Sequence, residues 1–588
     1  MSEKRPITFL KRIIPWLSYW TPLVLLAELP PLSSWLQNKY QVTLIDLLLP
    51  IILSLLTATV VACIFYPLSK KTPLGSFVGA ILTVLVIGDQ YESKLSSLYP
   101  AIKALNPIPQ LKSWEGTVIS LAFIVLVALM ARYVGLVIDR LVETRNWKAK
   151  DLVGGITVVI VVTFVLQLYP TVRTITTEWG QFSYKPTSTL GTQAALSTGT
   201  EKPDIYYIVL DRYASQDVLQ QQFGFDNSAF IKFLTDNGYY SNPNAHQNYP
   251  YTTMSIASTL NADYHTDIVQ KFAGSPDQTI FAYHEAIRNA TVIKRLKSLG
   301  YTYDELGSWY EATNEAPLAD HVYQPEGLLT VLGHTYTMNT FSKNLLTQSP
   351  FWRLTEHGIS LGNFQVLAYG GLGEQQATPY KLDALNDLAD QPAGGRFIFA
   401  HVLVPHNPYY YNADGSLNPN TGDDNVGELI KQKYVNQVKY INSQMEPLLA
   451  KINKNSGGKA IVILQSDEGP YPASLNDDLF DGNAIETELA NGSMLNWSDA
   501  NLQMKYGNLA AYHIPESTTA DLTQGADNVN VFRLVLNRYF KDTLPYLPKC
   551  YYAYPDGRSE PFVYRDITKR LTGTANPLCS ANSDFGKN

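Results

Sequence analysis

Three carboxylates and two histidines lie in short polar segments, each in or just after an apolar run of the chain. They are Asp211, His401, His406, Asp467 and Glu468. Carboxylate oxygens can converge on a divalent cation, which lowers the pKa of a nucleophile and neutralises charge on a phosphoryl or sulfuryl group. We therefore expect a metal-dependent site for the transfer or hydrolysis of such groups. Each residue, taken alone, also fits a turn, a helix cap or an ordinary loop.

A hydroxyl nucleophile is available in the segment NYPYTTMSIAS at 248–258, which contains Thr252 and Thr253. At the N-terminus of a helix, a hydroxyl lies beside free backbone N–H groups and the positive end of the helix dipole. Both features also attract an anionic substrate. Either threonine could simply cap a helix, and these considerations alone do not choose between them.

The apolar runs that precede these residues predict strands of one sheet. They are IYYIVL at 205–210, RFIFAHVLV at 396–404 and KAIVILQ at 459–465. Helical patterns lie between them, for example at 434–452, and strands alternating with helices favour an α/β domain with a mainly parallel central sheet. Ligands of such sheets bind beyond the carboxyl ends of the strands, where the polar residues fall.

The order of these motifs resembles the alkaline phosphatase superfamily, in its sulfatase-like branch. The closer likeness is to lipoteichoic acid synthases and lipid A phosphoethanolamine transferases, which place five transmembrane helices before an extracytoplasmic α/β domain. The likeness covers nearly the whole chain, and its motifs lie between residues 204 and 540. The expected fold is an α-helical transmembrane bundle followed by an alkaline-phosphatase-like domain.

The resemblance implies a role for each motif. In that family an acidic residue after the first strand binds the metal, and Asp211 in VLDRYAS matches it. The nucleophilic threonine stands in a T-x-x-S context, which favours Thr252 over Thr253. An H-x-x-x-x-H-x-P segment handles the substrate, and 401–408 matches it. This implies that His406 acts on the leaving group or substrate phosphate and that His401 lies in the same pocket.

The family's Asp-His-Gly triplet, which completes the metal site, is replaced here by Asp467-Glu468-Gly469. The resemblance then implies one divalent cation held by oxygen atoms of Asp211, Thr252, Asp467 and Glu468. Such a site suits Mg²⁺, Mn²⁺ or Ca²⁺ better than Zn²⁺. A degenerate site without turnover is the alternative. The C/S-x-P-x-R context of formylglycine sulfatases is absent from the sequence, and a two-zinc site would need more histidines.

The chain before residue 173 contains five long apolar stretches, which predict five transmembrane helices. A spanning helix needs about 20 apolar residues. The stretches lie at 13–35, 46–69, 72–89, 116–138 and 151–172. A cleaved signal peptide is the alternative for the first stretch, although four further stretches follow it and no small-residue cleavage site stands out. We expect residues 1–172 to form a transmembrane helical domain.

The basic residues of the loops predict the orientation of this domain. They concentrate in the N-terminal segment, at 70–71 and at 140–150, which share one side of the membrane if the chain crosses five times. Loops rich in Lys and Arg stay in the cytoplasm, although the loop at 89–115 also carries three lysines. The prediction is a multi-pass protein of the plasma (inner) membrane with its C-terminal domain outside the cytoplasm.

Residues 173–203 are rich in Ser, Thr and Gly and lack periodicity, so we expect a flexible linker before a catalytic domain at 204–588. Of the three cysteines, Cys63 falls in a predicted span. Cys550 and Cys579 fall in the domain placed outside, where disulfides persist, and we predict a disulfide between them.

These features predict a membrane-anchored, metal-dependent phosphotransferase or hydrolase that acts on a head group or envelope ester through a covalent phosphothreonine. A linker near the membrane favours a lipid or lipid-linked substrate, with a glycan, a lipid or water as the acceptor. A net charge of -7 argues against nucleic acid as a partner. A hydrolase of soluble phosphate or sulfate esters and a non-catalytic envelope protein are the alternatives. The sequence does not indicate an oligomeric state.

Overall fold

The described part of the chain forms two compact units. The computed structural model describes residues 5–39, 42, 44–88, 94, 113–187, 190, 202–274, 279–308, 310–314, 316–324, 328–331, 334–338, 340–352, 358–361, 364–369, 374–419, 428–471, 493–555 and 561–580. One unit, here the helical unit, comprises Met1–Thr177 and Gly327–Gly371. The other, here the catalytic unit, comprises Glu178–Glu326 and Leu372–Asn588.

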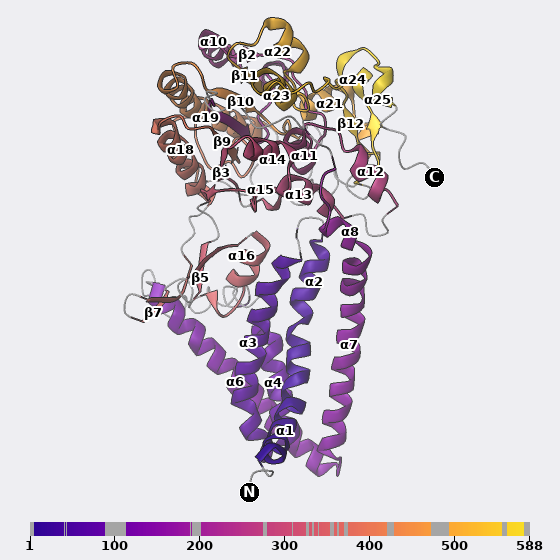
Figure 1. Ribbon diagram of the computed structural model, residues 1–588. Helices are drawn as coiled ribbons and strands as arrows, with labels where there is room; N and C mark the ends of the chain where they lie inside the picture. The colour runs from indigo at the N-terminus through magenta and orange to yellow at the C-terminus, as the bar shows by residue number, and fades with distance from the viewer. Residues whose placement is uncertain are drawn as a thin grey trace. The chain divides into compact units, whose positions relative to one another are not determined.

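Helices occupy each of the five stretches predicted to span the membrane (Figure 1). They are α1 (Arg5–Ala27), α2 (Leu29–Gln37), α3 (Leu48–Phe65), α4 (Pro73–Ile87), α6 (Ser113–Thr144) and α7 (Ala149–Thr177). Three described segments are long and apolar enough to cross a membrane: Leu48–Lys70, Val118–Thr144 and Ala149–Thr177. The first predicted span is divided between α1 and α2 at Glu28, where Pro30 and Pro31 follow and begin the second helix.

Helices α4 and α6 pack so closely that two facing positions require glycine. A Cβ atom on Gly75 would lie 2.2 Å from the backbone oxygen of Gly135, and a Cβ atom on Gly135 would lie 2.0 Å from that of Gly75. Small residues allow backbones to approach in this way inside helical bundles. Asp139 also accepts a hydrogen bond from the backbone nitrogen of Gly75 at 3.0 Å.

A small antiparallel sheet that the sequence analysis did not foresee also belongs to the helical unit. Its strands and one helix are β5 (Leu328–Val331), β6 (His334–Thr337), α16 (Thr340–Thr347), β7 (Ile359–Leu361) and β8 (Phe364–Tyr369), in the order β6-β5-β8-β7. The prediction of one continuous domain over 204–588 did not foresee that residues 327–371 belong to the helical unit. The chain leaves the catalytic unit after Glu326 and returns to it at Leu372.

The catalytic unit is built around a seven-stranded sheet in the order β2-β11-β10-β1-β9-β3-β4. The strands are β1 (Ile205–Leu210), β2 (Tyr240–Ser241), β3 (Thr302–Leu306), β4 (His321–Val322), β9 (Arg396–Val402), β10 (Ile461–Gln465) and β11 (Ala510–His513). Strands β10, β1, β9, β3 and β4 run parallel, and β11 runs antiparallel to both of its neighbours, β10 and β2. The three predicted strands are β1, β9 and β10, and they lie side by side, so the predicted α/β fold is confirmed.

Both faces of the sheet are covered. Alternate residues of β1 point to opposite faces, as in any strand, and both sets are buried. The helices of this unit are α8 (Trp179–Phe182), α9 (Gln216–Phe223), α10 (Ser228–Asp236), α11 (Thr252–Asn261), α12 (Thr266–Phe272), α13 (Phe281–Arg288), α14 (Thr291–Ser298), α15 (Glu311–Asn314), α18 (Glu374–Asp390), α19 (Glu428–Asn455), α21 (Asp499–Tyr506), α22 (Thr519–Gly525), α23 (Val531–Phe540), α24 (Thr568–Thr572) and α25 (Pro577–Ser580). Helices α11, α13, α14 and α23 share one core with Tyr207, and α18 and α19, which lie side by side in Figure 1, share the other with Ile208.

The ends of the catalytic unit differ in part from the prediction. The expected flexible linker at 173–203 begins as helix, because α7 continues to Thr177. Tyr184 is buried, and its hydroxyl donates a hydrogen bond to Asp267 at 2.5 Å. Residues 188–189 and 191–201 lie outside the described residues. The predicted Cys550–Cys579 disulfide is confirmed, near the short ladder of β12 (Tyr552–Ala553) and β13 (Arg565–Asp566). Cys63 lies in α3 as a free, exposed thiol.

Candidate active site

The predicted site residues come from the carboxyl ends of three neighbouring strands. Strand β1 pairs in parallel with both β9 and β10, so these ends meet at one edge of the sheet. Val209 is in register with His401 on β9 and with Gln465 on β10. Asp211 follows β1 directly, and Asp467 follows Ser466 after β10.

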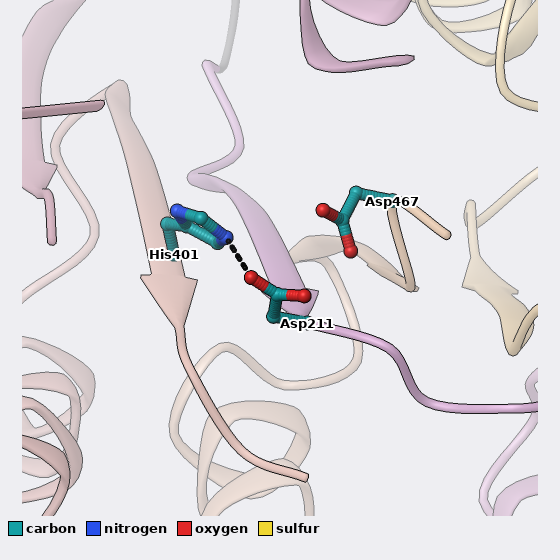
Figure 2. Close-up of side chains that lie close together, drawn as sticks. All are labelled: Asp211, His401 and Asp467. Atoms are coloured by element: carbon teal, nitrogen blue, oxygen red, sulfur yellow. Dashed lines mark ion pairs between the residues drawn. The ribbon is translucent and has the colours of Figure 1, made fainter. Parts of the chain in front are cut away.

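Asp211, His401 and Asp467 converge on one point. One ligand atom from each residue lies within 4.8 Å of the others, and His401 Nε2 is 3.3 Å from Asp211 Oδ2 (Figure 2). Figure 2 shows the two carboxylates and the imidazole directed toward a common space between the strand ends. All three residues are buried. Two carboxylates and an imidazole at this spacing form a candidate site for one metal ion.

Two hydroxyls fix the orientation of the His401 ring. His401 Nδ1 lies 2.9 Å from Thr313 Oγ1 and 3.2 Å from Ser308 Oγ. A hydrogen bond from Nδ1–H to a hydroxyl oxygen leaves the Nε2 lone pair facing Asp211, which is the arrangement that metal-binding histidines need. Sequence reasoning missed both hydroxyl residues, although they follow β3, the strand beside β9, and thus lie at the same edge.

When no cation is bound, burial and the nearby negative charges disfavour the ionised forms of the two carboxyls in this cluster. Burial, then the neighbouring charges of Asp211 and Glu468, raise the pKa of Asp467 to about 7. Burial also raises the pKa of Asp211 above its ordinary value. Within the described part of the chain, Asp211 Oδ1 and Asp467 Oδ2 are buried and accept no hydrogen bond. Buried carboxylate oxygens normally have a partner, so the donor set fits a bound divalent cation.

Thr252 lies beside the cluster as the first residue of α11. Its hydroxyl lies close enough to the Asp467 carboxyl to lower the pKa of that group against the larger effect of burial, and its position at the helix N-terminus places it in the positive part of the helix dipole. The neighbouring Thr253 instead shares a hydrogen bond of 2.7 Å with the hydroxyl of Tyr310. The structure therefore brings Thr252, and not Thr253, to the strand-end residues.

Glu468 was expected to bind the metal, but its carboxylate is directed to two cations. Arg212 Nε lies 2.7 Å from one of its oxygens, and Lys505 Nζ lies 2.9 Å from the other. Burial raises the pKa of Glu468, but Lys505 and Arg212 together hold it below its ordinary value. Glu468 therefore stays ionised, and it is absent from the group of ligand atoms that converge at Asp211.

The two cations that bind Glu468 also contact an aromatic ring. Lys505 Nζ lies 3.7 Å from the centre of the Tyr471 ring, and the Arg212 guanidinium lies 4.7 Å from it. Cations are attracted to the negative face of such rings. Arg212 follows Asp211 with a φ of 61°, and Lys505, on α21, is 0% exposed in its side chain. Sequence reasoning assigned neither cation to the site.

His406 is half-buried, and its charge lowers the pKa of Asp211 against the effect of burial. Its Nδ1 contacts the carbonyl oxygen of Asn407, whose side chain accepts a hydrogen bond from Arg212 Nη1 at 2.8 Å. The structure thus separates the two predicted histidines. His401 belongs to the metal cluster, whereas His406 lies further along the same segment, near Arg212.

Comparison with known proteins identifies the family. The sulfatase family model matches residues 203–530, and the chain belongs to this family. Membership of this family makes the protein an enzyme of the alkaline phosphatase superfamily, as the sequence motifs predicted. No curated protein matches the chain.

Several solved structures resemble the catalytic unit. The C-terminal periplasmic domain of EcEptC from Escherichia coli, in complex with Zn, is 11% identical with a TM-score of 0.38, covering 67% of this chain and 99% of that one. The soluble domain of lipooligosaccharide phosphoethanolamine transferase A from Neisseria meningitidis is 11% identical, with a TM-score of 0.34 and coverage of 58% and 89%. A 2-O GAG sulfatase, BT1596, is 12% identical, with a TM-score of 0.34 and coverage of 59% and 72%.

Proposed function

We propose that this protein is a membrane-anchored, metal-dependent phosphotransferase or hydrolase that uses Thr252 as its nucleophile. One observation carries the proposal: the Thr252 hydroxyl, at the N-terminus of α11, lies beside Asp467 of the Asp211–His401–Asp467 cluster. A hydroxyl next to a general base and a cation site is the arrangement of an activated nucleophile.

The reaction proceeds in two halves. In the first, Thr252 Oγ1 attacks phosphorus, and its proton passes to the neighbouring Asp467 carboxylate. The bond between phosphorus and the leaving oxygen breaks, and His406 gives that oxygen a proton. In the second, a hydroxyl of the acceptor or of water attacks the phosphothreonine and gives its proton to His406, the bond from phosphorus to Oγ1 breaks, and Oγ1 takes back the proton held by Asp467, which restores Thr252.

Asp211, His401 and Asp467 would hold one divalent cation, with Thr252 adjacent. When bound, the cation neutralises charge on the phosphoryl oxygens and favours the ionised hydroxyl. The expectation of Mg²⁺, Mn²⁺ or Ca²⁺ rather than Zn²⁺ depended on an all-oxygen site that included Glu468. With an imidazole in its place the donor set is mixed, and such sets also bind Zn²⁺.

Arg212 and Lys505 add positive charge next to the cluster. Glu468 balances only one of these two cations, and Lys505 is fully buried. With a divalent cation also bound, the site carries a surplus of positive charge, and a buried site of this kind attracts an anionic group more strongly than an exposed one because the local dielectric is low. This feature supports an ester with ionised oxygens, such as a phosphodiester head group, as the substrate.

The helical unit supports a location at the membrane. Three helices are long and apolar enough to span it, and the basic loops favour a multi-pass arrangement with a cytoplasmic N-terminus. The catalytic unit would then lie outside the cytoplasm, at the surface of the plasma (inner) membrane. There it meets lipid or lipid-linked substrates at high effective concentration.

Mass spectrometry of the intact reaction tests the nucleophile. The full-length protein, incubated with a phospholipid donor and a divalent cation, should carry a phosphoryl adduct on the peptide that contains Thr252. Thr252→Ala should abolish the adduct and lower turnover by at least about 1,000-fold. The matched control is Thr253→Ser, which keeps the hydroxyl that bonds Tyr310 and should keep activity.

Product analysis with the same donor separates the candidate activities. Transfer of the head group to an added glycan or lipid indicates a transferase, and release to water alone indicates a hydrolase. A protein that binds the cation but shows no adduct and no turnover with any phosphate or sulfate ester would contradict the proposal. So would unchanged turnover in Thr252→Ala.

A further inference from the structure

The antiparallel sheet at 327–371 belongs to the helical unit and not to the catalytic unit. The sheet packs against the beginning of α3. Leu329, Met338 and Leu346 form a small buried cluster against which Leu49 and Leu53 of α3 pack. A segment that interrupts the sequence of the catalytic unit therefore packs against the first turns of the apolar helix α3.

Polar contacts fix the same junction. The Ser342 hydroxyl, on α16, donates a hydrogen bond of 3.3 Å to the carbonyl oxygen of Asp46, just before α3. Phe351 and Trp352 pack against the apolar cluster from the end of the α16 segment. Tryptophan, like tyrosine, is enriched where a membrane meets water.

The length of the apolar segment that begins with α3 indicates how deep in a bilayer its contact with the sheet would lie. The apolar segment Leu48–Lys70 has 23 residues, which is about 35 Å of helix, against a hydrocarbon core of about 30 Å. Its first turns therefore lie at the outer boundary of the core. Leu49 and Leu53, which contact the sheet, lie in these turns.

The free end of the sheet exposes apolar side chains. Leu361 on β7 lies opposite Phe364 on β8, so both point to the same face. Leu361 is 72% exposed and Phe364 is 50% exposed. The lipid-facing surface of α3 has the same character: Leu48, Ile52, Leu56, Val60 and Ile64, four residues apart, are 43–58% exposed.

We propose that the end of the β7–β8 hairpin, formed by Leu361 and Phe364, inserts into the outer leaflet of the membrane that α3 crosses. This inference rests on the membrane location in the proposed function. The sheet then acts as a second attachment of the catalytic domain, because the chain enters and leaves it from the catalytic unit at 326 and 372. The occupant is lipid, since the hairpin shares a unit with helices whose exposed residues are apolar.

An environment-sensitive fluorophore on single cysteines tests this placement in the full-length protein. Cys63→Ser removes the free thiol, and nitrobenzoxadiazole is attached to the cysteine of Phe364→Cys. The labelled protein is placed in nanodiscs of phosphatidylglycerol and phosphatidylcholine, with or without doxyl lipids as quenchers. Ser360→Cys is the matched control, because Ser360 is exposed on the strand face opposite to Leu361. Leu166→Cys, on α7 at a side chain 69% exposed, reports the membrane itself.

The label at 364 should emit at shorter wavelength than in water and be quenched by doxyl lipid to an extent comparable with 166, whereas 360 should be quenched less. Quenching at 166 without quenching at 364 would overturn the insertion and leave the membrane location intact. No quenching at either position would overturn both. A blue-shifted label at 364 that doxyl lipid does not quench would show that protein covers the hairpin, which also overturns the inference.

Discussion

Replacing Glu468 by glutamine tests whether this carboxylate binds the metal or balances buried charge. Its oxygens lie 2.7 Å from Arg212 Nε and 2.9 Å from Lys505 Nζ, and its side chain is 3% exposed. Removing one partner of a buried ion pair costs about 3–5 kcal/mol, because the remaining charge stays buried without compensation. Glutamine keeps the shape and one acceptor oxygen, so we expect about 3 kcal/mol.

The assay is thermal unfolding of the full-length protein in nanodiscs, with and without cation, beside metal analysis of the desalted protein. In metal-free protein the loss should lower Tm by roughly 4 °C, because the unfolding entropy of a unit of this size is about 0.8 kcal/mol/K. The Glu468→Gln protein should still bind one equivalent of cation, because Asp211, His401 and Asp467 remain. Asp467→Asn is the control that should lose the cation.

A second substitution makes the test specific to charge. Lys505→Met alone should also destabilise the protein, since it removes one of the two cations that contact Glu468. The double variant should be more stable than the sum of the single losses predicts, by about 1–3 kcal/mol. Loss of the cation from Glu468→Gln with an unchanged metal-free Tm would refute this reasoning and make Glu468 a ligand.

Three further predictions concern the site and the topology. His401→Gln should lose the cation, whereas His406→Gln should keep it and lower turnover by about 100-fold; equal metal loss in both variants would contradict these assignments. Because burial raises the pKa of Asp467 from 3.8 to about 7, the metal-free folded state retains a proton that the unfolded chain releases. The free energy of unfolding of the metal-free protein should therefore fall by on the order of 4 kcal/mol as pH rises from about 4 to about 7. Saturating cation should remove this loss. Unfolding curves measured with chelator at pH 5 and at pH 8 would contradict the prediction if they coincided. A reporter fused after residue 200 should be active only outside the cytoplasm, and an active cytoplasmic fusion would overturn the five-span topology.

The strand-end residues were predictable from the sequence because a parallel sheet gathers them at one edge. Each buried strand is an uninterrupted apolar run, and the polar residue after it must lie where the run ends. This rule placed Asp211 and Asp467 together. It does not give the register between strands, and the pairing of Val209 with His401 is what brings that imidazole to Asp211.

Residues recruited from outside the motifs were not predictable. Lys505 comes from α21, in a stretch without any motif, and reaches Glu468 only through the tertiary packing of that helix. Ser308 follows β3 and Thr313 lies in the short helix α15, and neither belongs to a motif that would place it against His401. The sheet at 327–371 was missed because short, mixed-polarity strands carry little periodicity over three to six residues.

The charges around the cluster explain how a glutamate can stand where the family has a histidine. The substitution adds a negative charge beside Asp211 and Asp467, and three buried carboxylates alone would repel one another. Arg212 and Lys505 contribute two positive charges in direct contact with the added carboxylate. Three negative and two positive charges sum to -1, and a divalent cation brings the total to +1 with His401 neutral. A site with this balance still attracts an anionic ester, so the altered triplet is compatible with catalysis as long as both cations remain.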